Sequence, residues 1–236
     1  MLMKKGILLI FTLLNAFALL ASEPYFCTRA GVKFHYERRQ VGSGKLTQTT
    51  LFEITSFASS QGGHQVSYAV TLKKANGKEM FGGRAVQTAL ISSNGDASLN
   101  FGETVKGFVG NMFPRVKITA TESTAVLPAR MQPGDTLPET HCTMKVSGVP
   151  VYFHVTDRKV LRRETITTPA GTFDCLVVRE RKEEDAPFHH LDNWLDNYYA
   201  VGIGYVRHDL YDKNMRLLES EVLVRIEEPV AGDNRH

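Results

Sequence analysis

The chain has 236 residues, of which 28 are Lys or Arg and 25 are Asp or Glu, and its formal net charge at pH 7 is +3. This charge balance lacks the basic excess typical of nucleic-acid binding, so we expect no nucleic-acid partner. A chain of this length can bury a sizeable core, as one large domain or two small ones.

Residues 1–22 have the layout of a secretory signal peptide. The lysine-containing start Met-Leu-Met-Lys-Lys is followed by an apolar stretch over residues 6–20 and by the small pair Ala21-Ser22. The apolar stretch is shorter than the roughly 20 residues that span a bilayer. A lipid anchor is not expected, because Cys27 follows Glu-Pro-Tyr-Phe rather than small residues. We expect a periplasmic or secreted protein with no membrane span in the mature chain.

Alternating apolar and polar residues predict β-strands along most of the remaining chain. Turn signals such as Gly62-Gly63 and Asn76-Gly77, whose residues tolerate positive φ, separate the first of them. The predicted strands cover residues 32–40, 46–58, 65–74, 79–92, 115–121, 125–127, 143–147, 152–156, 159–167, 201–210 and 216–227. This pattern predicts one predominantly antiparallel β domain.

The segment 104–113 departs from the strand pattern. Its apolar residues fall at helical spacing, at Val105, Phe108, Val109, Met112 and Phe113. The glycines around them weaken a helix. We expect a short helix or an irregular segment that covers one face of the sheet.

Residues 168–171, Thr-Pro-Ala-Gly, predict a hairpin turn. Proline fixes φ at about −65° at the second position, and glycine relieves crowding at the fourth. On the outgoing strand Phe173, Cys175 and Val177 share one face. Cys175 is therefore expected to be packed or bridged rather than reactive.

The three cysteines, Cys27, Cys142 and Cys175, would meet an oxidising environment after export. Two interpretations stay open: buried free thiols that behave as small apolar side chains, or one disulfide with one thiol left over. If a disulfide forms, we expect Cys27 to pair with Cys175, because the segment around Cys27 would otherwise be a free terminus. Closing so long a loop would stabilise the fold by roughly 4–5 kcal/mol, and Cys142 would be the spare thiol.

The densest polar and aromatic cluster is the sequence HHLDNWLDNYYA at residues 189–200. His189, His190, Asp192 and Asp196 could be imagined as metal ligands, but no recognised ligand spacing accompanies them. We therefore expect a solvated strand face, with no metal and no cofactor. A metal-dependent hydrolase with a site near His190 and Asp192 is the less favoured alternative.

Other patterns also argue against catalysis. The sequence contains no Gly-x-Ser-x-Gly, and His141 and Cys142 would point to opposite faces of a strand. The acidic residues of segment 180–185 alternate with basic ones, which is typical of an exposed hairpin end. We expect a non-enzymatic protein.

Aromatic residues gather near the C-terminal hairpin, as they do in sugar-binding platforms and lipid-lined grooves. Core packing of a β-sheet uses the same residues, so both interpretations stay open. The candidate residues for the rim of a ligand site are Trp194, Tyr198, Tyr199 and Tyr205.

Three stretches together resemble the TapB-like family of secreted bacterial proteins. They are PARMQPGDTLPE (128–139), RKVLRRETITTPAGTFDCLVV (158–178) and YYAVGIGYVRHDLYDKNMRLLESEVL (198–223). The likeness is strong over residues 128–226 and weaker over 25–113. It implies a β-rich, strongly curved sheet and no established activity, and it offers no catalytic residues. The family pattern Trp-Tyr-Ala-Pro-Gly-Val-Gly lacks its proline in this chain, so the turn before the last hairpin is expected to be looser.

We therefore predict one domain over residues 23–228, mainly β, with at most one or two short helices, followed by a polar tail over residues 229–236. Its large antiparallel sheet is expected to be curved like a half-barrel or an open barrel. The concave face is expected to bind an apolar or amphipathic, lipid-like small molecule or an envelope protein. The alternative is a structural or assembly module that acts through a protein–protein surface.

Overall fold

The computed structural model describes residues 22–187 and 189–229. Residues 1–21 of the expected signal peptide and residues 230–236 of the expected polar tail lie outside the described residues. Within the described residues, no helix is both long enough and apolar enough to cross a membrane.

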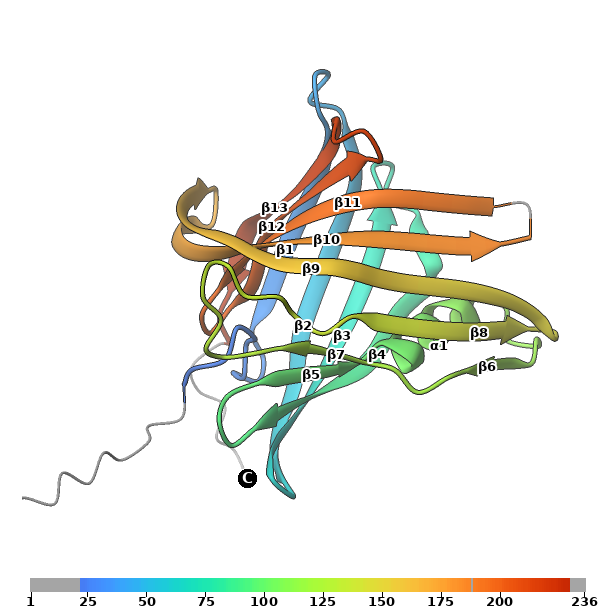
Figure 1. Ribbon diagram of the computed structural model, residues 1–236, viewed down its shortest axis with the longest axis horizontal. Coiled ribbons are helices and arrows are strands. Elements are labelled where there is room, and N and C mark those ends of the chain that lie inside the picture. The colour runs from blue at the N-terminus through green and yellow to red at the C-terminus, as the bar shows by residue number, and fades with distance from the viewer. Residues whose placement is uncertain (1–21, 188, 230–236) are drawn as a thin grey trace, which may run out of the picture.

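Thirteen strands form one antiparallel sheet (Figure 1). Their order across the sheet is β6-β8-β9-β10-β11-β12-β13-β1-β2-β3-β4-β5-β7. The strands are β1 (Lys33–Gln40), β2 (Leu46–Ser60), β3 (Gly63–Lys74), β4 (Glu79–Ser92), β5 (Ala97–Asn100), β6 (Ile118–Ala120), β7 (Thr124–Leu127), β8 (Thr140–Val146), β9 (Val149–Thr168), β10 (Gly171–Ala186), β11 (His189–Ala200), β12 (Gly204–Asp212) and β13 (Leu217–Glu227). The prediction of a mainly β domain built on a large antiparallel sheet is confirmed.

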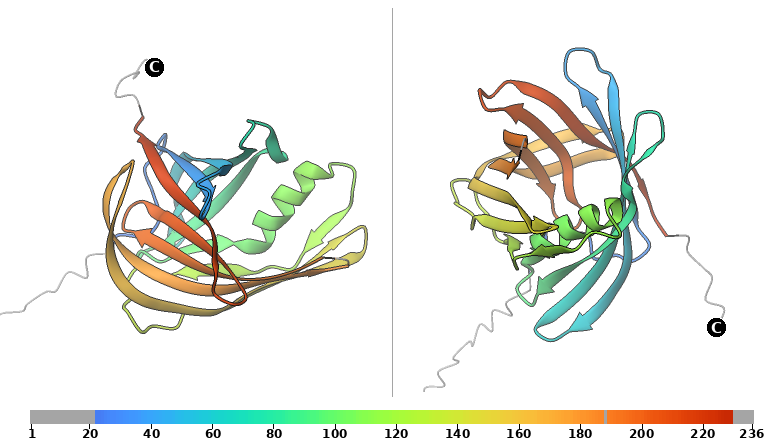
Figure 2. Two further views of the ribbon diagram at one scale, coloured as in Figure 1. Left: turned by 90° about the horizontal axis from the view of Figure 1, so that it is seen from above. Right: turned by 90° about the vertical axis from the view of Figure 1, so that its right-hand side faces the viewer.

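The two edge strands of the sheet are consecutive in the chain. β6 pairs with β8 at one edge, and β7 pairs with β5 at the other. Only residues 121–123 join β6 to β7, and four extended Cα–Cα steps reach at most about 14 Å. The sheet must therefore curve until its edges nearly meet, which explains the open, half-barrel shape in Figures 1 and 2.

The helix α1 (Phe101–Met112) lies in the opening between the two ends of the curved sheet (Figure 2) and packs against β4, β6 and β8. Its N-cap is Asn100, whose side-chain oxygen accepts a hydrogen bond from the Glu103 amide at 3.0 Å. Gly102 allows close approach, because a Cβ there would collide with the carbonyl oxygen of Thr121. The segment expected to cover one face of the sheet therefore forms a helix.

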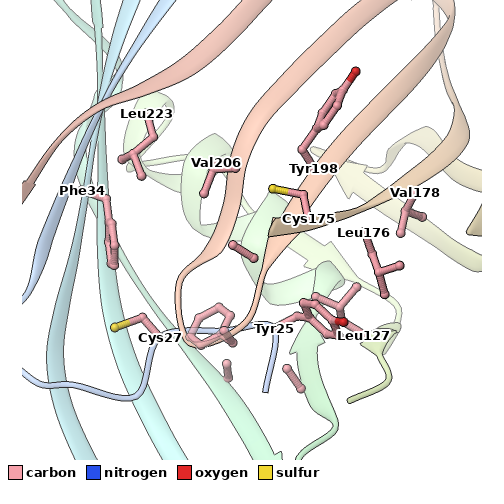
Figure 3. Close-up of a cluster of buried hydrophobic side chains, with 14 of the residues drawn as sticks. Tyr25, Cys27, Phe34, Leu127, Cys175, Leu176, Val178, Tyr198, Val206 and Leu223 are labelled. Atoms are coloured by element: carbon pink, nitrogen blue, oxygen red, sulfur yellow. The ribbon is translucent and has the colours of Figure 1, made fainter. Parts of the chain in front are cut away.

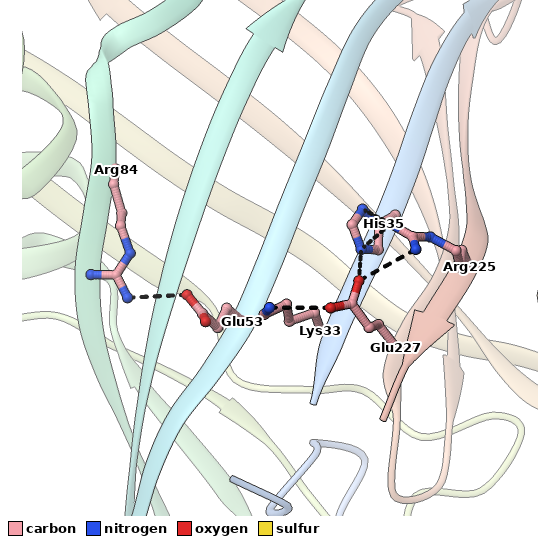
Figure 4. A network of polar contacts seen from close by, with 6 residues as sticks. All are labelled: Lys33, His35, Glu53, Arg84, Arg225 and Glu227. Atoms are coloured by element: carbon pink, nitrogen blue, oxygen red, sulfur yellow. Dashed lines mark hydrogen bonds and ion pairs between the residues drawn. The ribbon is translucent and has the colours of Figure 1, made fainter. Parts of the chain in front are cut away.

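The two faces of the sheet differ as the strand alternation predicts. On β1, Phe34 and Tyr36 are buried on the concave side. Lys33 and His35 project from the opposite side, where both contact the Glu227 carboxylate, at 3.2 and 3.3 Å (Figure 4). The three side chains are 27–40% exposed, so the convex face of β1 is in contact with solvent, and ion pairs of this kind contribute little stability.

The turn between β9 and β10 is the hairpin predicted from Thr-Pro-Ala-Gly. Thr168 ends β9, and its hydroxyl accepts a hydrogen bond from the Ala170 amide at 3.1 Å. β9 is one continuous strand, whereas the alternation predicted two strands with a break near Asp157. Asp157 has a φ of +51°, and the register with β10 shifts beside it. A bulge therefore absorbs the irregularity without ending the strand.

The main core contains fully buried side chains such as Phe34, Val206 and Leu223 (Figure 3). All three cysteines are buried free thiols in this structure, as in the first of the two interpretations, and the bridge considered between Cys27 and Cys175 is not formed. Figure 3 shows these two side chains apart, with their sulfur atoms not directed at each other. Burial raises the pKa of Cys175 to about 12, so this thiol stays protonated and packs as a small apolar group.

Candidate functional site

The concave face of the sheet encloses a cavity of about 250 Å³. The curved strands form most of its wall, the first turn of α1 closes one side, and Tyr25 and Phe26 from the segment before β1 close another. Most of the lining is apolar or aromatic, with a few polar side chains that include Thr140, Arg158 and Glu180.

Aromatic rings from neighbouring strands form one wall of the cavity. Phe52 and Tyr68 stack with their ring centroids 4.7 Å apart, and Phe26 meets both rings edge-on. Tyr36 stacks on Tyr205 at 4.6 Å. The Tyr36 hydroxyl also donates to the backbone oxygen of Tyr205 at 3.0 Å. These contacts give the wall a defined shape, because each ring is held by a partner from another segment.

A buried ion pair crosses the polar part of the cavity wall. Arg158 Nε donates to Glu180 Oε2 at 3.2 Å, and the two side chains are only 5% and 13% exposed. Arg158 Nη1 donates to the backbone oxygens of Pro138 and Val126, at 2.7 and 3.2 Å. The pair thus joins β9 and β10 to β7 and to the segment between β7 and β8.

A short polar chain extends from this ion pair across the inner face. Asn197 donates to Glu180 Oε1 at 3.1 Å, and its side-chain oxygen lies 2.7 Å from His208 Nδ1. Burial, followed by the charge of Arg38, lowers the pKa of His208 to about 4. The neutral ring therefore donates from Nδ1, because an amide oxygen can only accept.

The four aromatic residues considered for a ligand rim divide between the two faces of the sheet. Tyr199 and Tyr205 line the cavity. Trp194 and Tyr198 are an odd number of positions from Tyr199 on β11 and therefore point away from it. On that opposite face the Tyr198 ring lies 5.2 Å from the Arg207 guanidinium. Only Tyr199 and Tyr205 of the four are placed to touch a ligand in the cavity.

The carboxylates considered as metal ligands are paired with arginines. Arg179 donates to both oxygens of Asp196 at 2.7 Å, and Arg181 donates to those of Asp192 at 2.9 and 2.8 Å. Arg181 also holds the pKa of Asp192 below its usual value. In residues 22–187 and 189–229, no group of three or more His, Cys, Asp or Glu side chains could hold a metal ion.

The expectation that residues 189–200 form a solvated strand face is wrong for Asp196, which is only 1% exposed. His189 and His190 remain exposed at the start of β11. The strand passes from the exposed end of the sheet into its buried centre, and the sequence alternation alone did not show where this change occurs.

The thiol of Cys142 and the imidazole of His141 do not form a catalytic couple. Cys142 is buried on the inner side of β8, and burial raises its pKa. His141 is exposed on the outer side, where its Nδ1 lies 2.7 Å from Nδ1 of His154 on β9. The prediction that these neighbours point to opposite faces is therefore confirmed.

The polar residues of the cavity were missed from the sequence. Glu180 belongs to a charged run that predicted an exposed hairpin end. No pattern around Arg158 predicted that this residue would be buried. The available signal was the alternation on β10, where Leu176 and Val178 are buried on the same face as Glu180. Extended along β10, the same alternation places Glu180, the first acidic residue of the charged run, on the inner face.

The chain belongs to the DUF3108-like family, whose family model matches residues 30–223. This match covers most of the described β domain. It does not confirm the TapB-like resemblance, although the expected β-rich fold is present. No curated protein matches the chain.

Solved structures with the same fold include two bacterial proteins. One is a candidate lipoprotein of Parabacteroides distasonis ATCC 8503, which has a TM-score of 0.70 and 20% identity over 87% of this chain and 99% of that one. The other is a candidate exported protein of Bacteroides fragilis NCTC 9343 with a YmcC-like fold, at a TM-score of 0.69 and 23% identity over 87% of this chain and 100% of that one. At this level of identity the likeness establishes a shared fold.

Proposed function

We propose that this DUF3108-like protein is an exported, non-enzymatic β domain that binds a small apolar or amphipathic ligand in the cavity of its concave face. The cavity itself carries the proposal. Its volume of about 250 Å³ lies just below the roughly 300–1,000 Å³ typical of small-molecule sites, so it fits only a small ligand. Mostly apolar walls with a few polar groups are also typical of such sites.

Export is supported by the first residues of the chain and by the structural neighbours. The apolar stretch over residues 6–20, with lysines before it and Ala21-Ser22 after it, has the order of a signal peptide. Both neighbours are described as candidates for export or lipid attachment.

The chemistry of the lining favours binding over catalysis. Burial raises the pKa values of Tyr199 and Tyr205 well above that of a free phenol, so both hydroxyls stay protonated. Arg158 and Glu180 are engaged with each other and with neighbouring groups. The wall therefore offers shape and hydrogen bonds to a ligand, while its acid–base groups are occupied.

A cavity-filling variant tests this proposal. Ala125 lines the cavity from β7, and Thr124 on the same strand is exposed. We expect the neutral apolar dye N-phenylnaphthylamine to bind the wild type and Thr124→Leu with enhanced fluorescence. Ala125→Leu should bind at least tenfold more weakly, because its side chain occupies the space of the dye. No binding to the wild type, or equal binding to the two variants, would contradict a ligand-binding cavity.

Native mass spectrometry of the mature protein from its own envelope provides a second readout. We expect a copurified lipid-like molecule in the wild type and less of it in Ala125→Leu.

A second candidate function, an assembly module, is favoured by two exposed apolar side chains on β4. Val86 and Leu90 are 60% and 52% exposed, and they lie on the same face of the strand. Apolar side chains exposed together can mark a protein-contact surface. This function predicts that Val86→Ser with Leu90→Ser removes a specific cross-linked complex in intact envelopes, whereas Ala125→Leu leaves that complex in place.

A further inference from the structure

We infer that the polar part of the cavity binds a neutral oxygen acceptor of the ligand, such as an ester or amide carbonyl, through Thr140 and Arg158. This inference rests on the proposed function, because it assumes that a ligand occupies the cavity. It adds the chemical class: a single-chain, uncharged amphipath such as an acyl ester.

The first observation is an unpartnered hydroxyl at the cavity wall. Thr140 is only 2% exposed and lines the cavity. Its Oγ1 is buried and has no hydrogen-bond partner among the described residues. Buried polar groups in folded proteins are almost always paired, and an unpaired one destabilises the fold. An oxygen of a bound ligand would supply the missing acceptor.

The second observation is the free end of the Arg158 guanidinium. Its Nε donates to Glu180, and its Nη1 donates to two backbone oxygens. None of the side-chain hydrogen bonds among the described residues involves Nη2. Nη2 carries two N–H donors and cannot accept. Thr140 and Arg158 both line the same cavity.

The charges around these donors favour an uncharged acceptor. Glu180 already compensates Arg158, and its second oxygen accepts from Asn197. Arg38, another arginine on the inner face, is paired with Glu221 at 3.0 Å. A ligand carboxylate would therefore add a negative charge without a cation to balance it in a largely apolar enclosure, which is costly. A carbonyl oxygen can accept from either donor without this cost.

The remaining lining determines the other end of the ligand. The stacked Phe52 and Tyr68 rings form part of the same cavity. An alkyl chain fits against such a surface, because burying it there removes apolar area from water. The ligand is therefore expected to have one carbonyl-bearing head and one short to medium alkyl chain.

The test compares two ligands that share a chain but differ in head charge. Monodecanoylglycerol and decanoate are each used to displace N-phenylnaphthylamine from the wild type, from Thr140→Val and from Thr143→Val. Thr143 lies on the same strand but not on the inner face, so its variant is the matched control. We expect the glyceride to bind the wild type at least tenfold more tightly than decanoate.

Thr140→Val should weaken glyceride binding about five- to tenfold, which is the effect of one lost hydrogen bond. Its affinity for the dye should stay unchanged, and Thr143→Val should behave as the wild type. If Thr140→Val loses the dye as well, Arg158→Lys replaces it, since lysine keeps the charge without the planar second donor. Its glyceride affinity should fall by a similar factor.

Equal or tighter binding of decanoate would overturn this inference while leaving a ligand-binding cavity in place. Wild-type glyceride affinity in Thr140→Val, or in Arg158→Lys where that variant replaces it, would have the same consequence. Failure of the wild type to bind the dye or either ligand would instead remove the proposed function itself.

Discussion

Replacing Glu180 by Gln tests whether the ion pair at the cavity wall is as buried as the structure indicates. The substitution keeps the size of the side chain but removes its charge and one of its acceptor oxygens. Arg158 and Asn197 each donate to a different oxygen of Glu180. After the change, one of these donors faces an NH₂ group, and the guanidinium of Arg158 stays charged in its buried position.

The expected cost follows from this geometry. Removing one partner of a buried ion pair costs about 3–5 kcal/mol. Arg158 keeps two backbone oxygens as acceptors, so we expect a value near the lower limit, about 3 kcal/mol. Glu183→Gln is the matched control, because this residue pairs with Arg181 at 3.1 Å where the two side chains are 28% and 34% exposed. Its cost should stay below about 1 kcal/mol.

Urea unfolding measured at neutral pH gives both free energies and shows, through the slope m, whether the unfolded state has changed. The double variant Arg158→Met with Glu180→Leu should recover only part of the lost stability. It removes the unpaired buried charge, but it leaves the Asn197 amide and two backbone oxygens without these partners. If Glu180→Gln stays within about 1 kcal/mol of the wild type, Arg158 is solvated in the native protein. The electrostatic argument for a neutral ligand would then lose its basis.

Three further predictions concern pH, helix packing and the thiols. The pKa of His208 is lowered to about 4 from 6.5, so the unfolded state binds the extra proton between these pH values. The free energy of unfolding should therefore be fully retained above pH 6.5 and fall by about 2–3 kcal/mol as the pH decreases to 4, a value reduced because the residue is partly exposed. His208→Gln should remove that part of the slope in urea titrations, and an unchanged slope would argue against burial of the ring. Gly102→Ala should lower stability by about 1–3 kcal/mol, because its Cβ would collide with the carbonyl oxygen of Thr121. Gly107→Ala, which has open space around it, should raise stability by up to about 1 kcal/mol. Thermal unfolding that ranks the two variants the other way would refute this packing. Titration of the denatured, unreduced mature protein should find three thiols, and a single one would reveal the bridge between Cys27 and Cys175 instead.

Local features of this fold could be read from the sequence because their causes are local. Pro169 and Gly171 predict the hairpin between β9 and β10 from backbone preference alone, and alternation predicts most of the strands. The apolar spacing of residues 104–113 allowed a short helix, and α1 is that helix with an earlier start at Phe101. The helix begins there because Asn100 caps it, and an N-cap is itself a short-range interaction.

The tertiary structure decided which side of each strand faces the cavity and how deeply each residue lies. Tyr199 and Trp194 belong to the same aromatic cluster in the sequence, yet the pleat of β11 places only Tyr199 on the cavity wall. Arg158 and Glu180 come together across β9 and β10, and each would be expected at the surface by itself. Burial of such charges depends on the curvature of the whole sheet, which arises where residues 121–123 join its two edges. By itself the sequence determined the strands and turns, through preferences of neighbouring residues, whereas the cavity and its polar groups required contacts between strands that are distant in the chain.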